Sequence, residues 1–272
     1  MVMKIIDAHF HMFPSSGYGV QMLHEVGHEP GFPYLQEYYR EHGFVHGVIM
    51  SNGPTDPKYH KMPEEFSYCI GLDDVGDNPD VIAENLDNVE KNLQLPQCCG
   101  VKLYAGYSTV PITDPHYGPV YELAEHYHKP VAVHMGQTAH PSGQLRYSHP
   151  LNMDQAAVEH RHVQFVMCHF GNPFLEDAAA VLEKNPNVAA DLSGLLEGIK
   201  DLDRYFEEQA AYVMMLRGWL AYVEDWSKFM FGTDFPAVNL QNYVEFCQRL
   251  IPEKYWESFF FENANRIYKL GL

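Results

Sequence analysis

The sequence predicts an α/β protein that folds as a single (β/α)8 TIM barrel over residues 1–272, and three observations support this prediction. Eight short apolar runs recur along the chain, as is typical of parallel strands that are buried on both faces. Segments with helical spacing of apolar residues lie between most of these runs. Candidate metal ligands follow both the first and the last run, and only a closed barrel brings those two strands together.

The predicted strands are mostly continuous apolar segments rather than alternating ones. They are Lys4–His11, Val45–Ser51, Phe66–Asp73, Gly100–Tyr104, Pro130–Met135, Val163–His169, Asn187–Leu192 and Lys228–Asp234. A doubly wound open sheet is the alternative architecture. It is disfavoured because no Gly-x-Gly-x-x-Gly motif follows any of these strands and because the candidate site residues come from both early and late strands.

Helices are predicted where apolar residues recur every three or four positions. The segments are Pro79–Asn92, Pro119–Tyr127, Asp154–His160, Leu175–Asn185, Gln209–Val223, Leu240–Leu250 and Glu253–Leu270. Two connections are longer than the rest, from His11 to Phe44 and from His134 to Val163. Both leave the carboxyl ends of strands, where barrel enzymes place their sites, and long loops there are typical of lids or substrate-binding elements.

Composition excludes several classes of partner. Lys and Arg number 18 against 36 Asp and Glu, and the resulting charge of −18 disfavours nucleic acid and anionic membranes. The apolar runs are shorter than the roughly 18–20 residues that a membrane span needs, and no signal peptide is evident. Five cysteines without zinc-ribbon spacing indicate reduced thiols. We therefore expect a cytoplasmic protein that acts on a small molecule, with a homo-oligomer left open.

The candidate ligands predict a metal centre with an open position. His9 and His11 are two residues apart on one strand, so both side chains point to the same side about 6.6 Å apart. His134 from the fifth strand and Asp234 from the eighth can complete that site and leave room for a water, whose pKa falls to about 7 on zinc. Asp234 is then the natural proton acceptor, and His169 either binds a second ion or polarises the substrate.

Plain alternatives exist for each of these residues. His134 and His169 taken alone would be satisfied core histidines, and Asp234 alone would be a turn residue. Two buried strand histidines without an evident partner are costly, which disfavours a purely structural role for His9 and His11.

The motifs around these residues resemble the amidohydrolase superfamily, in the branch that includes aminocarboxymuconate-semialdehyde decarboxylase. The resemblance runs nearly end to end and rests on six segments: Ile6-Asp7-Ala8-His9-Phe10-His11, Gly100-Val101-Lys102-Leu103-Tyr104, Pro130-Val131-Ala132-Val133-His134-Met135-Gly136, Cys168-His169-Phe170-Gly171, Phe231-Gly232-Thr233-Asp234-Phe235-Pro236 and Glu262-Asn263-Ala264-Asn265-Arg266. The combination is specific for the superfamily, although no single motif is.

The resemblance implies that His9, His11, His134 and Asp234 bind a divalent ion, most simply zinc, and that His169 is a second ligand or a catalytic residue. It leaves the role of Lys102 open. Binuclear members carry a carboxylated lysine on the fourth strand that bridges two ions. Mononuclear decarboxylase-like members need no such bridge, and there the lysine stays an amine that can pair with a carboxylate.

Substrate-binding residues are less clearly indicated. Tyr104 is predicted to point inward beside Lys102 on the fourth strand. Arg146, in the loop that follows His134, is a candidate for binding a substrate carboxylate, with a plain surface arginine as the alternative. Asp191 ends the seventh strand and either lines the pocket or forms a turn.

The predicted function is that of a metal-dependent hydrolase acting on an amide, cyclic amide, lactone or ester bond of a small polar substrate. The alternative is a lyase, either a non-oxidative decarboxylase or a hydratase of a small unsaturated or aromatic carboxylic acid. A basic pocket group such as Lys102 would favour the lyase. A third alternative, a metal-binding barrel without catalysis, would need a full ligand set with no open position.

Overall fold

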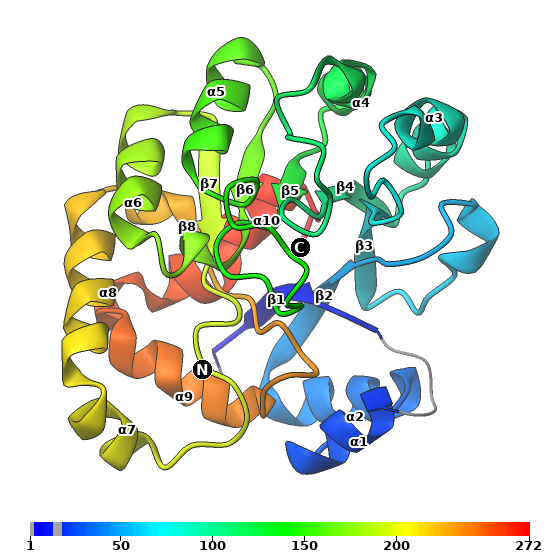
Figure 1. The fold of residues 1–272 in the computed structure, drawn as a ribbon. Helices are drawn as coiled ribbons and strands as arrows, with labels where there is room; N and C mark the ends of the chain where they lie inside the picture. Colours follow the sequence, from blue (N-terminus) through cyan, green and yellow to red (C-terminus); the bar gives the residue numbers. More distant parts are fainter. Residues whose placement is uncertain (1–2, 13–17) are drawn as a thin grey trace.

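The structure is a computed structural model that describes residues 3–12 and 18–272, and in it the strands form one barrel surrounded by helices (Figure 1). The sheet order is the chain order, and all neighbouring strands run parallel. The strands are β1 (Ile5–Phe10), β2 (Phe44–Met50), β3 (Phe66–Leu72), β4 (Cys98–Leu103), β5 (Val131–Val133), β6 (Phe165–Met167), β7 (Val188–Asp191) and β8 (Phe229–Met230). The predicted (β/α)8 TIM barrel is therefore confirmed.

The barrel closes between β1 and the segment that follows β8. Ala8 N donates to Phe231 O at 3.0 Å, Asp234 N donates to His9 O at 2.8 Å, and His11 N donates to Phe235 O at 2.8 Å. These hydrogen bonds place Asp234 directly beside the two histidines of the first strand.

Helices cover the outside of the barrel, as the apolar spacing predicted (Figure 1). They are α1 (Tyr18–Glu25), α2 (Phe32–His42), α3 (Asp80–Leu93), α4 (Gly118–His126), α5 (Leu151–Glu159), α6 (Leu175–Lys184), α7 (Leu202–Glu208), α8 (Ala210–Tyr222), α9 (Leu240–Leu250) and α10 (Asn263–Tyr268). Helices α1 and α2 lie in the connection from His11 to Phe44, which was predicted only as a long loop. Among the described residues no helix has the length and apolar character needed to cross a membrane.

Two predicted elements are wrong in their extent. The last strand was predicted to run to Asp234, but β8 ends at Met230 and Asp234 has a positive φ of 63°. The helix predicted over Glu253–Leu270 is broken into a 3-10 turn, a π-helical turn at Ser258–Glu262 and α10. Neither irregularity is visible in the apolar pattern, because residues 229–233 are all buried and the broken C-terminal segment still buries Phe259, Phe260, Ala264 and Ile267.

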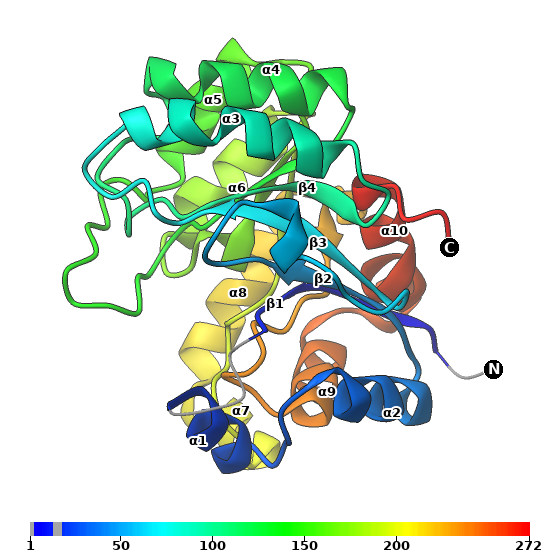
Figure 2. The same cartoon turned by 90° about the vertical axis from the view of Figure 1, so that its right-hand side faces the viewer.

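The interior of the barrel is filled by small and medium apolar side chains. It holds Ile6, Ala8, Val48, Met50, Cys69, Cys99, Ala132, Val166, Cys168, Ala189 and Met230. Three residues of α10 pack on this cluster, Ala264, Ile267 and Tyr268. In Figure 2, α10 lies at the end of the barrel opposite the long connection between β5 and α5. Helix α10 thus closes one end of the barrel, and the candidate site residues lie at the other end.

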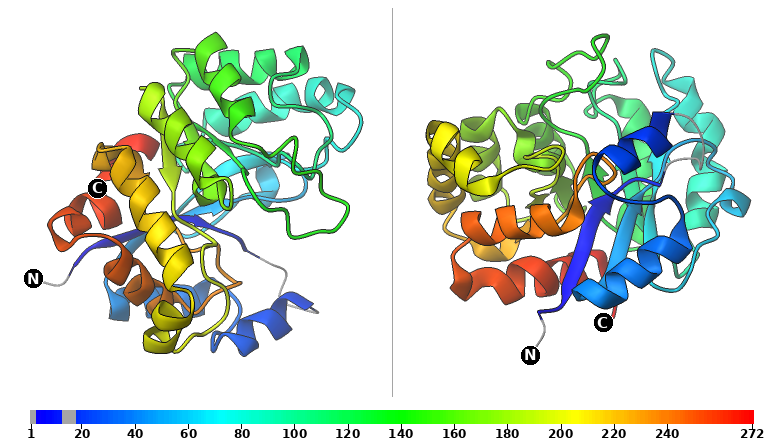
Figure 3. Two further views of the ribbon diagram at one scale, coloured as in Figure 1. Left: turned by 60° about the vertical axis from the view of Figure 1, so that its left-hand side comes forward. Right: turned by 90° about the horizontal axis from the view of Figure 1, so that it is seen from below.

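His28 ties the long β1–β2 connection to the start of α9, two segments that lie side by side in Figure 3. Its Nε2 accepts a hydrogen bond from Leu240 N at 3.0 Å, and its Nδ1 lies 2.7 Å from the hydroxyl of Tyr34. The ring also packs against Phe235, with 5.4 Å between ring centroids. Because burial disfavours the imidazolium, the pKa of His28 is lowered from 6.5 to about 4.

We predict that His28 makes the stability of the protein fall in mild acid. A folded-state pKa below the unfolded value means that the folded state resists protonation, so stability present above pH 6.5 is lost as the pH falls toward about 4. The free energy of unfolding of the parent, measured by urea denaturation, should fall more steeply over this range than that of His28→Gln. Parallel curves for the two proteins would contradict the prediction.

Candidate metal centre

Five of the predicted site residues meet at the carboxyl ends of the strands. His9 Nε2 lies 3.5 Å and His11 Nε2 lies 3.4 Å from Asp234 Oδ1. His169 Nε2 lies 3.0 Å from His134 Nδ1, and 4.8 Å separate the ring centroids of His9 and His169. The structure therefore brings together in space residues that are up to 225 positions apart in the sequence.

The backbone at these residues is shaped to present their side chains. His169 and Asp234 both adopt positive φ angles, 61° and 63°, which L-residues rarely do. Gly136, two residues after His134, has a φ of 93°, and a Cβ there would lie 2.1 Å from the carbonyl oxygen of Asn172. Only glycine fits at this position, because the loop after β5 passes directly against the loop after β6.

Backbone carbonyls fix the tautomers of three imidazoles, because a carbonyl oxygen can only accept a hydrogen bond. A proton must therefore sit on each nitrogen that faces a carbonyl when the imidazole is neutral. The contacts are His11 Nδ1 to Met50 O at 2.9 Å, His134 Nε2 to Gln137 O at 3.0 Å and His169 Nδ1 to Ser193 O at 3.2 Å.

The opposite nitrogens of these rings then carry lone pairs. In the neutral forms, His134 Nδ1 and His169 Nε2 face each other at 3.0 Å with no proton between them. His9 Nε2 is buried and has no hydrogen-bond partner in the described part of the chain, and it lies 3.5 Å from Asp234 Oδ1. Lone pairs that converge on a carboxylate are unfavourable unless a cation or a proton joins them, so the residues present fit a metal ion.

The electrostatics of the site favour the protonation states that bind metal. Burial lowers the pKa of His9 to about 4 and holds the pKa of His134 and His169 below its usual range. Burial alone would raise the pKa of Asp234, but the neighbouring histidines outweigh it and the pKa is well below its usual range. At neutral pH the site offers neutral imidazoles and a carboxylate, which suit zinc and related divalent ions.

The ligand atoms of His9, His169 and Asp234 all lie within 4.8 Å of one another. His134 reaches this group through its contact with His169, and His11 reaches it through Asp234.

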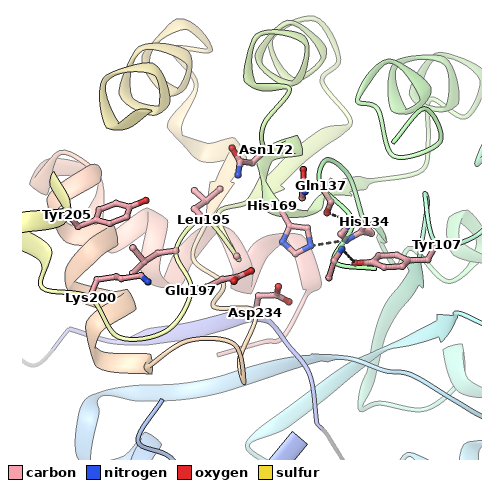
Figure 4. A pocket seen from close by; sticks show the side chains of 13 residues that line it. Tyr107, His134, Gln137, His169, Asn172, Leu195, Glu197, Lys200, Tyr205 and Asp234 are labelled. Atoms are coloured by element: carbon pink, nitrogen blue, oxygen red, sulfur yellow. Dashed lines mark hydrogen bonds between the residues drawn. The ribbon is translucent and has the colours of Figure 1, made fainter. Parts of the chain in front are cut away.

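Two cavities open at this centre and share Tyr107, His134, His169 and Asp234. The larger, of about 860 Å³, is also lined by His11, Met12, Phe32, Asn52, Gly53, Asp73, Lys102 and Tyr104. The smaller, of about 390 Å³, is shown in Figure 4, where Lys200 and Glu197 face the metal-binding side chains from the opposite wall. The candidate metal centre thus lies where a small molecule can reach it.

The other predicted residues have different surroundings. Lys102 is buried in the barrel, with its Nζ 3.2 Å from Cys168 Sγ and 5.1 Å from the centroid of the Tyr104 ring. Tyr104 donates a hydrogen bond to Ser51 O at 2.7 Å. Arg146 is exposed, stacks on the Tyr147 ring and is not among the residues that line either cavity. Its predicted role in substrate binding therefore has no contact that supports it.

Sequence reasoning missed several residues of the centre. Tyr107 lines both cavities, with its ring centroid 4.8 Å from that of His134, and Asn52 Oδ1 lies 3.0 Å from His11 Nδ1. Asp191, which the sequence left undecided, lies 2.9 Å from His9 Nδ1. For Asn52 and Asp191 the available sequence signal was a polar residue at the end of an apolar strand. Turns show the same pattern, so the signal did not single these residues out.

We predict that His9→Ala combined with His11→Ala abolishes metal binding, because it removes two imidazoles that face Asp234. Metal content per chain should be measured by elemental mass spectrometry on protein purified without added metal or chelator. His46→Ala is a matched control, since His46 is also buried but bonds Ser67 away from the centre at 2.9 Å. Full metal content in the double variant would show that the site is misassigned.

Comparison with solved structures shows the same fold in several enzymes. A 2,6-dihydroxybenzoate decarboxylase from Rhizobium is 14% identical with a TM-score of 0.64, covering 99% of this chain and 100% of that one. A probable 2-pyrone-4,6-dicarboxylic acid hydrolase from Acinetobacter baumannii is 13% identical with a TM-score of 0.64, covering 98% and 100%. A 5-carboxyvanillate decarboxylase from Novosphingobium aromaticivorans, complexed with manganese, is 9% identical with a TM-score of 0.66, covering 98% and 96%.

At these identities the likeness establishes the fold and not the reaction. A search of curated proteins gives no match. The sequence itself matches the family model described as Amidohydrolase over residues 60–270, which is most of the chain. That match covers His134, His169 and Asp234, three of the five side chains that meet at the centre. The chain is a member of the amidohydrolase family.

Proposed function

We propose that this protein is a metal-dependent decarboxylase of a small aromatic or unsaturated carboxylic acid. The observation that carries the proposal is the position of Lys102 in the wall of the larger cavity. This side chain is 1% exposed, and its polar contact among the described residues is the thiol of Cys168. A buried amine without a carboxylate partner is costly, and a substrate carboxylate would supply the missing partner.

The walls of the larger cavity suit an unsaturated or aromatic substrate. Phe32, Tyr104 and Tyr107 line it together with Lys102 and the metal-binding side chains. Aromatic side chains pack well against a planar ring, and a basic group fixes the orientation of a carboxylate. Decarboxylases of aromatic acids among the structures that share this fold agree with this choice of substrate.

The ion would be held by His9, His11 and Asp234 together with an imidazole of the His134–His169 pair. A bound divalent ion acts as a Lewis acid that polarises a substrate oxygen. Zinc is our first choice because the donor set is rich in imidazole.

The side chains of the protein would handle the carboxylate and the proton. Lys102 would pair with the carboxylate and hold it next to the metal-binding residues. The Asp234 carboxyl group, once it has taken a proton from water at the centre, would deliver that proton to the carbon that bears this carboxylate. The carbon–carbon bond would then break, and its electron pair would return to the substrate as CO2 leaves. One proton is taken up for each CO2 released, so the reaction balances without a redox partner.

Hydrolysis of a lactone, ester or amide is the second candidate. The side chain of Asp234 is 27% exposed and faces both His9 and His11, so it can accept a proton from an attacking water at the centre. The pyrone hydrolase-like structure with the same fold agrees with this chemistry.

The two candidates differ in their products. Zinc- and manganese-loaded protein should be incubated with a panel of hydroxylated benzoates and unsaturated acids and, separately, with lactones, esters and amides. In D2O, release of CO2 together with a product that carries one deuterium on the carbon that had borne the carboxylate group would support the decarboxylase. Hydrolysis products without CO2 would contradict it and support the second candidate.

We predict that Lys102→Met raises KM for the carboxylate substrate about tenfold or more, because a hydrogen bond to a charged group contributes about 1.5–3 kcal/mol. Steady-state kinetics on the best substrate of the panel measure this. Lys228→Met is the control, since Lys228 is partly buried but bonds Asn185 O at 3.0 Å, away from the cavities. An equal effect of both substitutions would argue against a carboxylate partner for Lys102.

We also predict one ion per chain in the parent and in Lys102→Met. The Lys102 amine already donates to the Cys168 thiol at 3.2 Å, which favours a free amine and a single ion over a carboxylated bridge. Elemental analysis of both proteins tests this. Two ions in the parent and one or none in the variant would instead support the bridging carbamate.

A further inference from the structure

Asp191, at the end of β7, contacts two of the metal-binding imidazoles without facing the cavities itself. The residue is completely buried and is not among those that line either cavity. Each of its two carboxylate oxygens serves a different histidine. A carboxylate only accepts hydrogen bonds, so every contact to Asp191 fixes the position of a proton on its partner.

The first oxygen fixes His9. Asp191 Oδ2 lies 2.9 Å from His9 Nδ1, so the proton of the neutral imidazole sits on Nδ1. The lone pair is then on Nε2, the atom that is buried without a hydrogen bond and points toward Asp234. Within residues 3–12 and 18–272, no backbone carbonyl bonds the His9 ring, in contrast to the rings of His11, His134 and His169.

The second oxygen fixes His169 through Ser193. The Ser193 hydroxyl donates its proton to Asp191 Oδ1 at 2.5 Å, so its oxygen accepts from His169 Nδ1 at 2.8 Å. Asp191 Oδ1 also accepts from the backbone N of His169 at 2.9 Å. That contact stabilises the unusual backbone there, where His169 and Phe170 have consecutive positive φ angles of 61° and 46°.

We propose that Asp191 is a positioning residue of the metal centre: it sets the tautomer of His9 and, through the Ser193 hydroxyl, reinforces the tautomer that the Ser193 carbonyl gives His169, so that both Nε2 lone pairs face the ion. The proposal rests on the metal centre and not on the choice between decarboxylation and hydrolysis. Partners that orient metal-binding histidines in this way typically change metal affinity 10- to 100-fold when they are removed.

A direct ligand role for Asp191 is disfavoured by its contacts, since both oxygens already accept hydrogen bonds from this network. A purely structural role is the remaining alternative. Asp7 provides the comparison because it is equally buried but accepts from backbone N–H groups and the Thr233 hydroxyl rather than from an imidazole.

Asp191→Asn and Asp7→Asn therefore form a matched pair. Both keep the shape of a buried carboxyl group, but only the first removes an acceptor from the imidazole network. Zinc affinity, measured by competition with a chromophoric chelator, should fall about 10- to 100-fold in Asp191→Asn and less than threefold in Asp7→Asn. Equal losses in both variants, no loss in Asp191→Asn, or a parent that binds no zinc would overturn the proposal.

The proton positions can be read without any variant and without a substrate. Nitrogen-15 NMR of the histidine rings of the protein as purified should show Nδ1–H at His9 and His169. A proton on Nε2 of His9 would overturn the proposal even if Asp191→Asn failed to fold. Ser193→Ala should leave the tautomer of His9 unchanged and alter only the signals of His169, which separates the two branches of the network.

Discussion

The closure of the barrel between its first strand and the segment after its last is the constraint on which the site depends. The carbonyl oxygen of His9 accepts from the backbone N of both Thr233 and Asp234, at 3.0 and 2.8 Å. Without these backbone hydrogen bonds, His9 and Asp234 would lie at opposite edges of an open sheet. Closure of the barrel therefore also assembles the candidate metal centre.

Much of the fold could be predicted because parallel strands buried on both faces must be apolar, which leaves a strong local signal. All eight strands were found in this way. Helices α1 and α2 were missed because proline and glycine punctuate the connection that contains them, as Pro30, Gly31 and Pro33 show. The early end of β8 was missed because Phe231 stays buried after pairing stops. An apolar pattern reports burial and not hydrogen bonding.

That the candidate metal ligands lie together could be predicted because imidazoles and carboxylates at strand ends share one rim of a barrel. The residues that surround these ligands could not be predicted. Asp191 and Asn52 stand in sequence contexts that also suit turns, and their partners lie 182 and 41 positions away. Lys102 was placed on the correct strand, but the sequence could not show that its neighbour would be the thiol of Cys168. Local patterns name candidates, whereas the pairing of atoms across strands is decided by the register of the barrel.

The carbonyl contacts of the imidazoles bear on how this site tolerates evolutionary change. Met50, Gln137 and Ser193 hold His11, His134 and His169 through their main-chain oxygens, which no replacement of their side chains removes. Met50 and Gln137 are therefore free to drift in sequence while the rings of His11 and His134 keep their orientation, whereas the Ser193 hydroxyl also bonds His169. Among the described contacts, His9 has its acceptor from a side chain alone, so a change of residue 191 would cost this network more than a change at the positions that use main-chain oxygens. Main-chain support of this kind lets a site keep its geometry while the side chains around it change.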